Sequence, residues 1–577
     1  MTKYYVADFE TTTIAPTYVW AWCIVEVGNL KNIETGTNIK SFLKYCKTLN
    51  NATVFFHNLQ FDGMFLLNYF FKMKYEWVSS KKERKDLSFT TMISDKGLWY
   101  QIEFIYKVMS KKVINVTFVD SLKLIPLSVD GIAKALKFPE QKLKIDYTAH
   151  DRLPEDSPLT NNEKEYIKHD VIIVAKAIEY FHSQGLTKMT IGSCALNEYM
   201  NIINKGNKNT FKRYYPPPFY YDDIKHSYKG GFTYVNPKYK GKIIENGVVL
   251  DVNSLYPSCM RYDYLPYGTG IFFNGKYKDN PLYKLYIQTI KCTFEIKENH
   301  IPCIQDKFGY GFKNEFLESG EDLTLVLTNV DLELFKEQYN IYNIEYLSGY
   351  MFKGTHGLFN EYIDKWTENK INAKKEANHG LYLISKLFLN SLYGKFGTDI
   401  RMRKKVPFYD NGIVKFTNGE YEYKEGIYLP VASFITSYAR RKTITSAQKV
   451  MDDFYSGKSN IDFIYADTDS LHLKSDNFEL PNLDIDPYKL GAWKYESKFN
   501  KAKFLRQKCY IENSTEDIEN DKPEYKLKVT VSGMPSGCHK YVTFDNFKFG
   551  TSYKGKKNPK KVNGGVIIED IDFTLIE

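Results

Sequence analysis

The chain has 577 residues, 43% of them hydrophobic, and its 79 basic and 69 acidic side chains give a net charge of +10. This length exceeds a single core and predicts two or more domains, and the modest positive charge favours a polyanionic partner. The eight cysteines form no C-x-x-C pair, and no apolar run resembles a signal peptide or a membrane span. These features argue against a disulfide scaffold, a zinc ribbon and a membrane protein, so we expect a soluble cytoplasmic protein.

The first predicted element is a strand over residues 3–13 that carries Asp8 and Glu10. Residues i and i+2 of a strand point to the same face, so both carboxylates are expected together. A second apolar strand, within residues 54–62, is predicted to run into a polar turn that ends on Asp62. Each of these acids alone is explained equally well as an ordinary strand-edge or turn charge.

A helix is predicted after Thr160, because Glu163 three residues later completes a capping box. Tyr166 and Asp170 are four residues apart and therefore share one face of that helix. Four acids on two strands and a helix predict a site for two divalent metal ions, with Tyr166 orienting an attacking water.

A second acidic set follows in the C-terminal half of the chain. Asp251 follows the apolar run 248–250, and Asp467 and Asp469 follow the run 463–465. Alternation along a strand predicts that the last two share a face, and strand ends bring all three acids together. Three converging carboxylates repel one another unless cations lie between them, and two divalent metals suit in-line phosphoryl transfer. A lone D-x-D is more often a solvated turn, but the second acidic strand end reverses that preference.

Helical spacing and basic clusters accompany the second acidic set. Lys386, Asn390 and Tyr393 fall at i, i+4 and i+7, which is one stripe of a helix. Without the acids, an ordinary amphipathic helix would explain this stripe. Lys/Arg clusters interleaved with aromatic residues indicate phosphate contacts beside base-stacking surfaces, and they lie at 401–405, 501–508 and 554–561.

These motifs resemble those of family B DNA polymerases. Three of them are similar to that family's proofreading-exonuclease motifs: D-F-E at 8–10, H-N-x2-F-D at 57–62 and Y-x3-D at 166–170. Three are similar to its polymerase motifs A, B and C: DVNSLYPS at 251–258, KLFLNSLYGKF at 386–396 and YADTDS at 465–470. Y-K-G-G at 228–231 and K-C-Y at 508–510 are similar to motifs of the protein-primed branch from small tailed phages, the phi-twenty-nine type.

The resemblance implies a multidomain α/β fold. It places an N-terminal RNase H-like 3′–5′ exonuclease domain at 1–190 and a right-hand polymerase after it, with palm at 191–261 and 429–531, fingers at 359–397 and thumb at 532–577. Two insertions specific to protein priming, the terminal-protein regions, are implied at 262–358 and 398–428. The polar, glycine-containing stretch 409–426 predicts a hairpin within the second insertion.

The resemblance also implies roles at the polymerase site. Asp251, Asp469 and the backbone carbonyl of Val252 would hold the metals, with Asp467 beside them as an important but less direct ligand. Tyr256 would lie under the sugar and exclude a 2′-hydroxyl, the group that distinguishes ribonucleotides. Triphosphate and base would be bound by Lys386, Tyr393 and a second lysine, taken as Lys374 with Lys370 and Lys375 as alternatives. Primer-template contacts are implied for Tyr228, Gly230, Gly231, Arg440, Lys508 and Tyr510.

At the exonuclease site, the resemblance assigns the metals to Asp8, Glu10, Asp62 and Asp170. Lys142 matches a catalytic lysine that stabilises developing negative charge. Leu143 and Lys144 replace a Gly-Asp pair of the family, so Lys144 is a rival for this role. Contacts with the single-stranded 3′ end are implied for Thr11, His57, Asn58, Phe61, Ser121 and Leu122.

The expected function is DNA-directed DNA polymerisation with 3′–5′ proofreading and strand displacement on a linear, phage-type genome. The implied cofactor is Mg²⁺, two ions per active site, with Mn²⁺ as a substitute. The implied partners are primer-template and single-stranded DNA, deoxynucleoside triphosphates and a terminal protein, with which the chain would form a heterodimer when it is not monomeric. The expected location is the cytoplasm of a bacterial host.

Three other functions agree less well with the sequence. A stand-alone exonuclease with a DNA-gripping C-terminal half predicts loss of the second acidic set, yet Asp251, Asp467 and Asp469 are present. A non-catalytic nucleic-acid scaffold predicts decay of one or both sets, and neither has decayed. An RNA polymerase or reverse transcriptase is disfavoured by Tyr256 and by the complete proofreading motifs.

Overall fold

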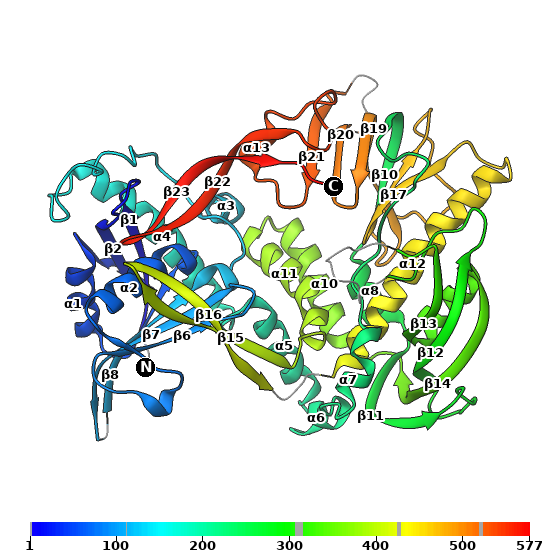
Figure 1. The fold of residues 1–577 in the computed structure, drawn as a ribbon, viewed down its shortest axis with the longest axis horizontal. Helices are drawn as coiled ribbons and strands as arrows, with labels where there is room; N and C mark the ends of the chain where they lie inside the picture. The colour runs from blue at the N-terminus through cyan, green and yellow to red at the C-terminus, as the bar shows by residue number, and fades with distance from the viewer. Residues whose placement is uncertain (1–2, 111, 306–315, 424–427, 518–522) are drawn as a thin grey trace.

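The chain is described by a computed structural model that covers residues 3–110, 112–305, 316–423, 428–517 and 523–577. Residues 306–315 of the first expected insertion and 424–427 of the second, including Gly426, lie outside the described residues. The molecule has two lobes on either side of a central group of helices, with the N-terminal lobe at the left of Figure 1.

The N-terminal lobe is built on an eight-stranded mixed sheet with the order β3-β2-β1-β4-β8-β7-β6-β5. Its strands are β1 (Tyr4–Thr11), β2 (Val19–Glu26), β3 (Asn29–Gly36), β4 (Ala52–Phe56), β5 (Glu76–Trp77), β6 (Ser88–Ile93), β7 (Trp99–Met109) and β8 (Lys112–Asp120). The helices of this lobe are α1 (Ile39–Leu49), α2 (Leu59–Lys72), α3 (Val129–Leu136) and α4 (Asn161–Ser183).

Strand alternation explains how this sheet is covered. Tyr5 and Phe9 of β1 belong to a core that includes residues of α1 and α2. Val6, between them, belongs to a different core that includes residues of α4, such as Ile178. Successive residues of a strand face opposite sides, so α1 and α2 cover one face of the sheet and α4 covers the other.

The predicted strand over 3–13 and the capping box are confirmed, but the prediction for Asp62 is wrong. β4 ends at Phe56, and Asn58 adopts a left-handed conformation (φ 78°) immediately before α2 begins. Asp62 therefore lies in the first turn of a helix rather than in a polar turn after a strand. The apolar run that follows continues as a buried helix, which a strand-length window does not reveal. The four acids thus come from one strand and two helices.

The second lobe contains a seven-stranded antiparallel sheet with the order β21-β20-β19-β10-β18-β17-β9. Its strands are β9 (Thr233–Val235), β10 (Ile243–Val252), β17 (Asp462–Asp467), β18 (Ser470–Lys474), β19 (Trp493–Arg506), β20 (Cys509–Thr515) and β21 (Lys526–Val531). α8 (Leu255–Tyr262) and the long α12 (Leu429–Tyr455) belong to the same core as Val248 and Leu250 of β10, whereas Val249 belongs to a separate core on the other face.

A smaller four-stranded sheet, at the right of Figure 1, has the order β11-β14-β12-β13. It is formed by β11 (Leu265–Asn274), β12 (Leu285–Ile296), β13 (Ser319–Thr328) and β14 (Tyr339–Thr355), with α9 (Asn329–Gln338) between the last two. The central helices are α5 (Ile191–Ile203), α6 (Thr210–Tyr214), α7 (Tyr221–Ile224), α10 (Asn360–Lys375) and α11 (His379–Phe396), and α13 (Ser536–His539) follows β21. Lys386, Asn390 and Tyr393 lie on α11 as predicted.

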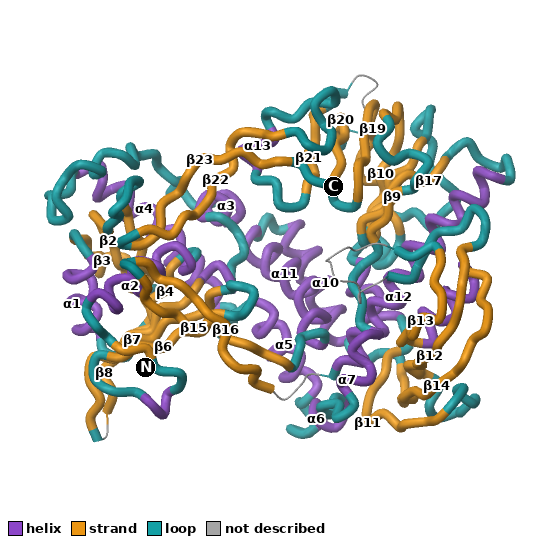
Figure 2. The backbone as a smooth tube through the Cα atoms, in the orientation of Figure 1, coloured by secondary structure: helices purple, strands orange, loops and turns teal. Residues whose placement is uncertain are grey.

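Two hairpins extend from the second lobe to the first, as Figure 2 shows. The first pairs β15 (Arg401–Asp410) with β16 (Ile413–Tyr423), and Asn411 and Gly412 form its turn with positive φ. A hairpin in this region is confirmed, although it begins earlier than the predicted stretch. The second hairpin pairs β22 (Ser552–Val562) with β23 (Gly565–Thr574).

Both hairpin tips are docked on the N-terminal lobe. Tyr409 stacks on Phe71 of α2, with the ring centroids 5.8 Å apart. The backbone N–H of Thr17 donates to the carbonyl oxygen of Asn563, at 2.9 Å. Gly564 adopts φ 98°, and a Cβ there would lie 1.7 Å from the Thr17 carbonyl oxygen, so only glycine fits this contact.

Candidate active sites

The four N-terminal acids meet where β1, α2 and α4 come together. Glu10, Asp62 and Asp170 are buried, and Asp8 is half-buried beside them. Burial and then the charge of Asp170 raise the pKa of Asp8 to about 7. Burial and the charge of Asp8 likewise raise the pKa values of Glu10 and Asp62 well above their usual range. Such a cluster needs a proton or a cation to offset its mutual repulsion.

Two oxygens of this cluster fit a cation in particular. Oδ1 of Asp62 and Oδ1 of Asp170 are buried and accept no hydrogen bond within the described part of the chain. A buried, unpartnered carboxylate oxygen is costly, and coordination to a divalent ion would satisfy it. The oxygen donors of these side chains therefore suit a divalent cation, although the described carboxylates are not closed into metal-ligand geometry.

Lys142 and Tyr166 complete this acidic cluster. The Lys142 Nζ lies 2.8 Å from Asp170 Oδ2. Burial lowers the pKa of Lys142, but the charge and hydrogen bond of Asp170 raise it more, so the pKa lies above its usual value. Lys142 and Lys144 are both exposed, but it is the ammonium of Lys142 that forms the ion pair with the cluster. The Tyr166 hydroxyl lies 2.9 Å from the hydroxyl of Tyr147, a residue that no motif or periodicity indicated.

Two of the residues expected to hold a 3′ end, Asn58 and Leu122, are linked by Asp120, a carboxylate that the sequence did not indicate. Its Oδ1 accepts the backbone N–H groups of Asn58 and Leu122, each at 3.0 Å, and so joins two loops. His57 Nδ1 lies 2.9 Å from Ser121 Oγ, and burial lowers the pKa of His57. Asn58 is exposed, whereas Phe61 and Thr11 are half-buried.

The cluster makes a prediction about stability and pH. A carboxyl whose pKa is raised in the folded state stabilises the protein less as pH rises above about 4, its unfolded pKa. For Asp8 this loss runs through a folded pKa of about 7, and Glu10 and Asp62, whose pKa values are also raised, act in the same direction. At pH 8 without divalent cations, Asp62→Asn removes one repelling charge and is expected to raise the melting temperature by about 2–4 °C. The gain should shrink as pH falls toward 4. Calorimetry at both pH values tests this, with exposed Asp130→Asn as the control, and a lower melting temperature for Asp62→Asn at pH 8 would contradict it.

The three C-terminal acids meet at one end of the seven-stranded sheet. Asp251 lies near the end of β10 opposite Ser470, and the backbone N–H of Val252 donates to the carbonyl oxygen of Asp469, at 2.7 Å. Burial, followed by the charge of Asp251, raises the pKa of Asp469 to about 6. The predicted convergence is therefore present.

The predicted reason for pairing Asp467 with Asp469 is wrong, however. Asp467 ends β17, whereas Asp469 lies in the two-residue turn before β18, in which Thr468 adopts φ 63°. The left-handed turn, rather than alternation along one strand, brings Asp469 close to Asp251. A positive φ at threonine is not a feature that sequence pattern predicts.

Lysines neighbour two of these three acids. Lys508 Nζ lies 2.9 Å from Asp467 Oδ1, and Lys494 Nζ lies 3.2 Å from Asp251 Oδ2. With the side chains in these positions, no three His, Cys, Asp or Glu residues among those described form a group in metal-ligand geometry. Tyr510 is buried and packs on Tyr465, whose hydroxyl donates to Asp467 Oδ2, at 3.2 Å. Tyr510 therefore acts on Asp467 indirectly, by packing against the tyrosine that is hydrogen-bonded to it.

Tyr256, which is expected to lie under the sugar, stacks on Tyr393 of α11. The rings of Tyr256 and Tyr393 are 4.0 Å apart and 23° from parallel. Lys370 of α10 is half-buried, and burial followed by the charge of Lys386 lowers its pKa. Of the three lysines proposed from the sequence, Lys370 is half-buried and its charge acts on Asp251, whereas Lys374 and Lys375 are exposed at the end of α10.

The Y-K-G-G segment runs between the two sites and touches both the sheet and α11. A Cβ on Gly231 would lie 2.6 Å from the Thr468 side chain, and one on Gly397 would lie 2.3 Å from the Tyr228 ring. The backbone N–H of Thr468 donates to the carbonyl oxygen of Phe232, at 2.6 Å. The segment therefore fixes the turn that carries Asp469.

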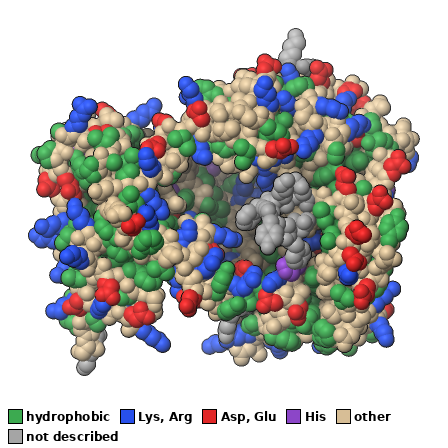
Figure 3. Space-filling view, in the orientation of Figure 1, with side chains coloured by type: hydrophobic (Ala, Val, Ile, Leu, Met, Phe, Trp, Pro, Cys, Tyr) green, Lys and Arg blue, Asp and Glu red, His purple; other side chains and the backbone are tan. Residues whose placement is uncertain are grey.

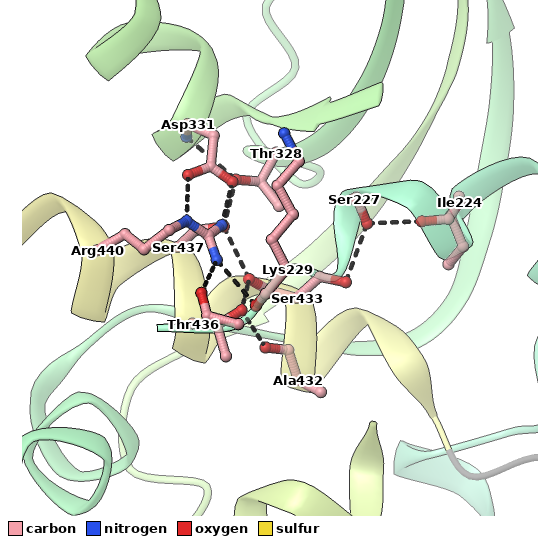
Figure 4. A network of polar contacts seen from close by, with 11 residues as sticks. Ile224, Ser227, Lys229, Thr328, Asp331, Ala432, Ser433, Thr436, Ser437 and Arg440 are labelled. Atoms are coloured by element: carbon pink, nitrogen blue, oxygen red, sulfur yellow. Dashed lines mark hydrogen bonds and ion pairs between the residues drawn. The ribbon is translucent and has the colours of Figure 1, made fainter. Parts of the chain in front are cut away.

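Arg440 lies inside the protein, where direct contact with a nucleic acid is excluded. Its guanidinium pairs with Asp331 of α9 at 2.6 Å and donates to the carbonyl oxygens of Lys229 and Gly230 at 2.9 and 3.1 Å. Figure 4 shows this network, in which Ser437 also donates to Asp331. The sequence indicated a surface contact, because the pattern gave no sign of an acidic partner more than a hundred residues away. The residue instead joins α9, α12 and the Y-K-G-G segment.

The surface between the lobes is hollowed and basic. Figure 3 shows a central hollow with Lys and Arg side chains in its depth and at its edge. A concave basic surface attracts polyanions such as nucleic acids. In the part of the chain that the structure describes, no helix is long and apolar enough to cross a bilayer.

Comparison with protein families and known sequences gives a consistent result. The family model for DNA polymerase type B, organellar and viral, matches residues 45–157 and 154–486. The DNA polymerases of Bacillus phage Nf and Bacillus phage phi29 are 41% and 40% identical to this chain, with 99% of both sequences covered in each case. The DNA polymerase of Streptococcus phage Cp-1 is 34% identical over 100% of this chain and 99% of its own length.

Solved structures agree with the sequences. Phi29 DNA polymerase complexed with primer-template DNA and incoming nucleotide substrates matches with a TM-score of 0.92 at 40% identity. Its complex with single-stranded DNA matches with a TM-score of 0.90 at 38% identity, and both comparisons cover 100% of each chain. The chain is therefore a DNA-directed DNA polymerase with exonuclease and polymerase domains, and it belongs to the type B DNA polymerases of viruses and organelles, among the phi29-type phage enzymes.

Proposed function

We propose that this polymerase copies a linear phage-type genome by protein priming, displaces the non-template strand as it advances and proofreads with a 3′–5′ exonuclease. The observation that carries the proposal is the presence of two complete carboxylate sets in one chain, one in each lobe. Similarity to phage polymerases over the full length supports the same assignment.

In synthesis, Asp251, Asp469 and the backbone carbonyl of Val252 are proposed to hold two divalent cations, with Asp467 beside them. Mg²⁺, with Mn²⁺ as a substitute, suits ligands that are all oxygen. The chemistry supplied by such cations is a lowered pKa for the attacking 3′-hydroxyl and compensation of charge on the triphosphate. Lys508, which is held by its ion pair to Asp467, is proposed to position the primer end, and Tyr510 supports it.

The incoming nucleotide is proposed to lie between α8, α10 and α11. Lys386 and Lys370 would bind the triphosphate as compact charges, and the lowered pKa of Lys370 reflects a buried position among other lysines that an anion would relieve. Lys374 and Lys375, at the end of α10, are the alternatives to Lys370 for the second triphosphate contact. Tyr393 would pack against the base.

Tyr256 is proposed to select deoxynucleotides. Its ring is stacked on Tyr393, and in that position it would collide with a 2′-hydroxyl. Tyr256→Val is expected to raise the relative kcat/KM for ribonucleotides about 10- to 100-fold, measured by single-nucleotide incorporation. Tyr256→Phe keeps the ring and should retain discrimination, and unchanged selectivity in Tyr256→Val would refute the assignment.

In proofreading, Asp8, Glu10, Asp62 and Asp170 are proposed to hold the cations. Lys142 would stabilise the negative charge that develops on the phosphate, and Tyr166, hydrogen-bonded to Tyr147, would orient the attacking water. The frayed 3′ end is proposed to lie on Thr11, His57, Asn58, Phe61, Ser121 and Leu122.

Tyr228, Gly230 and Gly231 are proposed to lie against DNA between the two sites, with Arg440 holding their backbone from behind. Gly231→Ala would push its new methyl group into Thr468 and shift the turn of Asp469. Primer extension is expected to slow about tenfold, whereas shortening of single-stranded DNA should change little. Gly206→Ala, where a Cβ also meets open space and which has no proposed contact with DNA, is the matched control. Equal effects of the two substitutions would contradict this account.

The proposed domain limits follow the order of the elements. They are exonuclease 1–190, palm 191–261 and 429–531, terminal-protein regions 262–358 and 398–428, fingers 359–397, and thumb 532–577. The proposed partners are primer-template and single-stranded DNA, deoxynucleoside triphosphates and a terminal protein bound to a monomer of this chain. Phi29 DNA polymerase has been solved with primer-template DNA, single-stranded DNA and nucleotides. The proposed location is the cytoplasm of a bacterial host.

Extension of a labelled primer on a circular single-stranded template, with Mg²⁺ and all four deoxynucleotides, tests the function. Products longer than the circle are expected, together with primer shortening when nucleotides are omitted. Shortening in both reactions would instead indicate a stand-alone exonuclease. A separate reaction tests priming, because a cognate terminal protein should become covalently labelled by one deoxynucleotide, and normal extension without any such labelling would refute protein priming.

A further inference from the structure

A lysine lies directly beside one of the carboxylates assigned to metal binding. Lys494 is the second residue of β19, and the strand register places it opposite Asp251 of β10. Directly opposite residues of an antiparallel pair project from the same face of the sheet. The Lys494 Nζ accordingly lies 3.2 Å from Asp251 Oδ2. The register therefore brings the two side chains together on one face of the sheet.

The backbone that carries Lys494 is anchored on both sides. The neighbouring Trp493 is buried, and its Nε1 donates to Ser446 Oγ of α12, at 3.0 Å. The backbone N–H of Trp493 donates to Asp484, and its carbonyl oxygen accepts from Asp486. The Lys494 side chain is 36% exposed, so the ammonium can leave Asp251 while the main chain stays in place.

Two lysines place positive charge beside Asp251, where a divalent cation would bind. Burial raises the pKa of Asp251. The positive charge of Lys494 opposes that rise, and Lys370 of α10 opposes it to a smaller extent. Lys494 is also one of the charges that lower the pKa of Lys370. Glu496, on the same strand, acts in the opposite direction on Asp251. A divalent cation approaching Asp251 therefore meets an ammonium that already interacts with the carboxylate.

We propose that Lys494 competes with the divalent cation for Asp251 and so sets the cation concentration at which DNA synthesis begins. The proposal rests on the role of Asp251 as a cation ligand in the function proposed above. Two physical effects oppose simultaneous binding: the ammonium takes up carboxylate lone pairs that a metal would use, and its charge repels the metal. Once the cation is bound, the ammonium turns outward to solvent.

The first test is the Mg²⁺ dependence of Lys494→Ala. The Mg²⁺ concentration for half-maximal primer extension is expected to fall about 3- to 10-fold. The Mg²⁺ dependence of primer shortening, measured in the same protein without nucleotides, should not change, because Lys494 belongs to the other site. Retained shortening also reports that the variant is folded, and Lys494→Gln provides a second neutral variant.

The second test does not depend on catalysis. In an Asp8→Ala/Asp62→Ala background, which lacks two of the proposed nuclease ligands, Ca²⁺ is titrated and the melting temperature is followed. Lys494→Ala should lower the Ca²⁺ concentration at the midpoint of stabilisation by a similar factor. Lys494→Arg keeps the charge and should retain the original midpoint.

Lys498→Ala is the matched control, since it removes one charge from the same strand at a position where the lysine lies over the Phe478 ring. An unchanged or higher cation requirement in Lys494→Ala would overturn the proposal, and the higher value would indicate that Lys494 assists the substrate instead. A wild-type protein that extends no primer at any Mg²⁺ concentration would refute the proposed function rather than this inference.

Discussion

Asp469→Asn is expected to reduce primer extension by about a thousandfold or more while leaving primer shortening unchanged. Asp469 is held in the turn after β17 by the hydrogen bond between its carbonyl oxygen and the Val252 N–H, so asparagine should keep the backbone position. The change removes the negative charge next to Asp251 and with it a proposed cation ligand. Single-turnover extension and shortening, measured on the same preparation, give the two rates.

Asp467→Asn is the comparison within the same motif. Asp467 is paired with Lys508 and accepts from the Tyr465 hydroxyl, so its charge is already offset by protein groups. A smaller loss of extension than in Asp469→Asn is expected. The reverse order would show that the assignment of the direct ligand is wrong.

Asp170→Ala is expected to reduce primer shortening by about a thousandfold and to leave extension on a matched primer close to normal. The substitution removes one of the four repelling acids and the partner of Lys142 at 2.8 Å. Because mismatched ends would then persist, the error frequency of copied DNA should rise. Shortening of a labelled single strand and sequencing of extension products measure both effects.

Lys142→Ala and Lys144→Ala form a matched pair for the same site. Lys142 donates to Asp170, and no contact of Lys144 with the four acids is found among the described residues, so Lys142→Ala should lower the shortening rate strongly and Lys144→Ala should not. A strong effect of Lys144→Ala alone would transfer the catalytic role to it.

Local sequence rules predicted the elements that short-range chemistry decides. The capping box at Thr160 and Glu163 marked the start of α4, since both of its hydrogen bonds form within four residues. Helical spacing placed Lys386 and Tyr393 on one face of α11. The two acidic sets were found because apolar runs end on carboxylates in several separate segments of the chain.

The residues that the sequence did not indicate are those whose roles depend on tertiary contacts. Asp120, Tyr147 and Lys494 act through partners on other loops, helices or strands, and no motif or period marks them. The role of Arg440 depends on Asp331, which is distant in sequence and buried only in the folded chain. Asp62 was misplaced on a turn because the left-handed Asn58 starts a helix where the polar residues suggested a loop. Such features arise from tertiary contacts, which propensity does not encode.

The docking of both hairpins on the N-terminal lobe has a practical consequence for protein engineering. Val414 of one hairpin and Val566 of the other are buried in the same apolar core as Phe65 and Phe70 of α2. Deleting the nuclease domain would therefore leave two hairpins with bare apolar tips and a polymerase prone to aggregate. A nuclease-free enzyme is better obtained by exchanging single acids, because those changes leave the shared core whole.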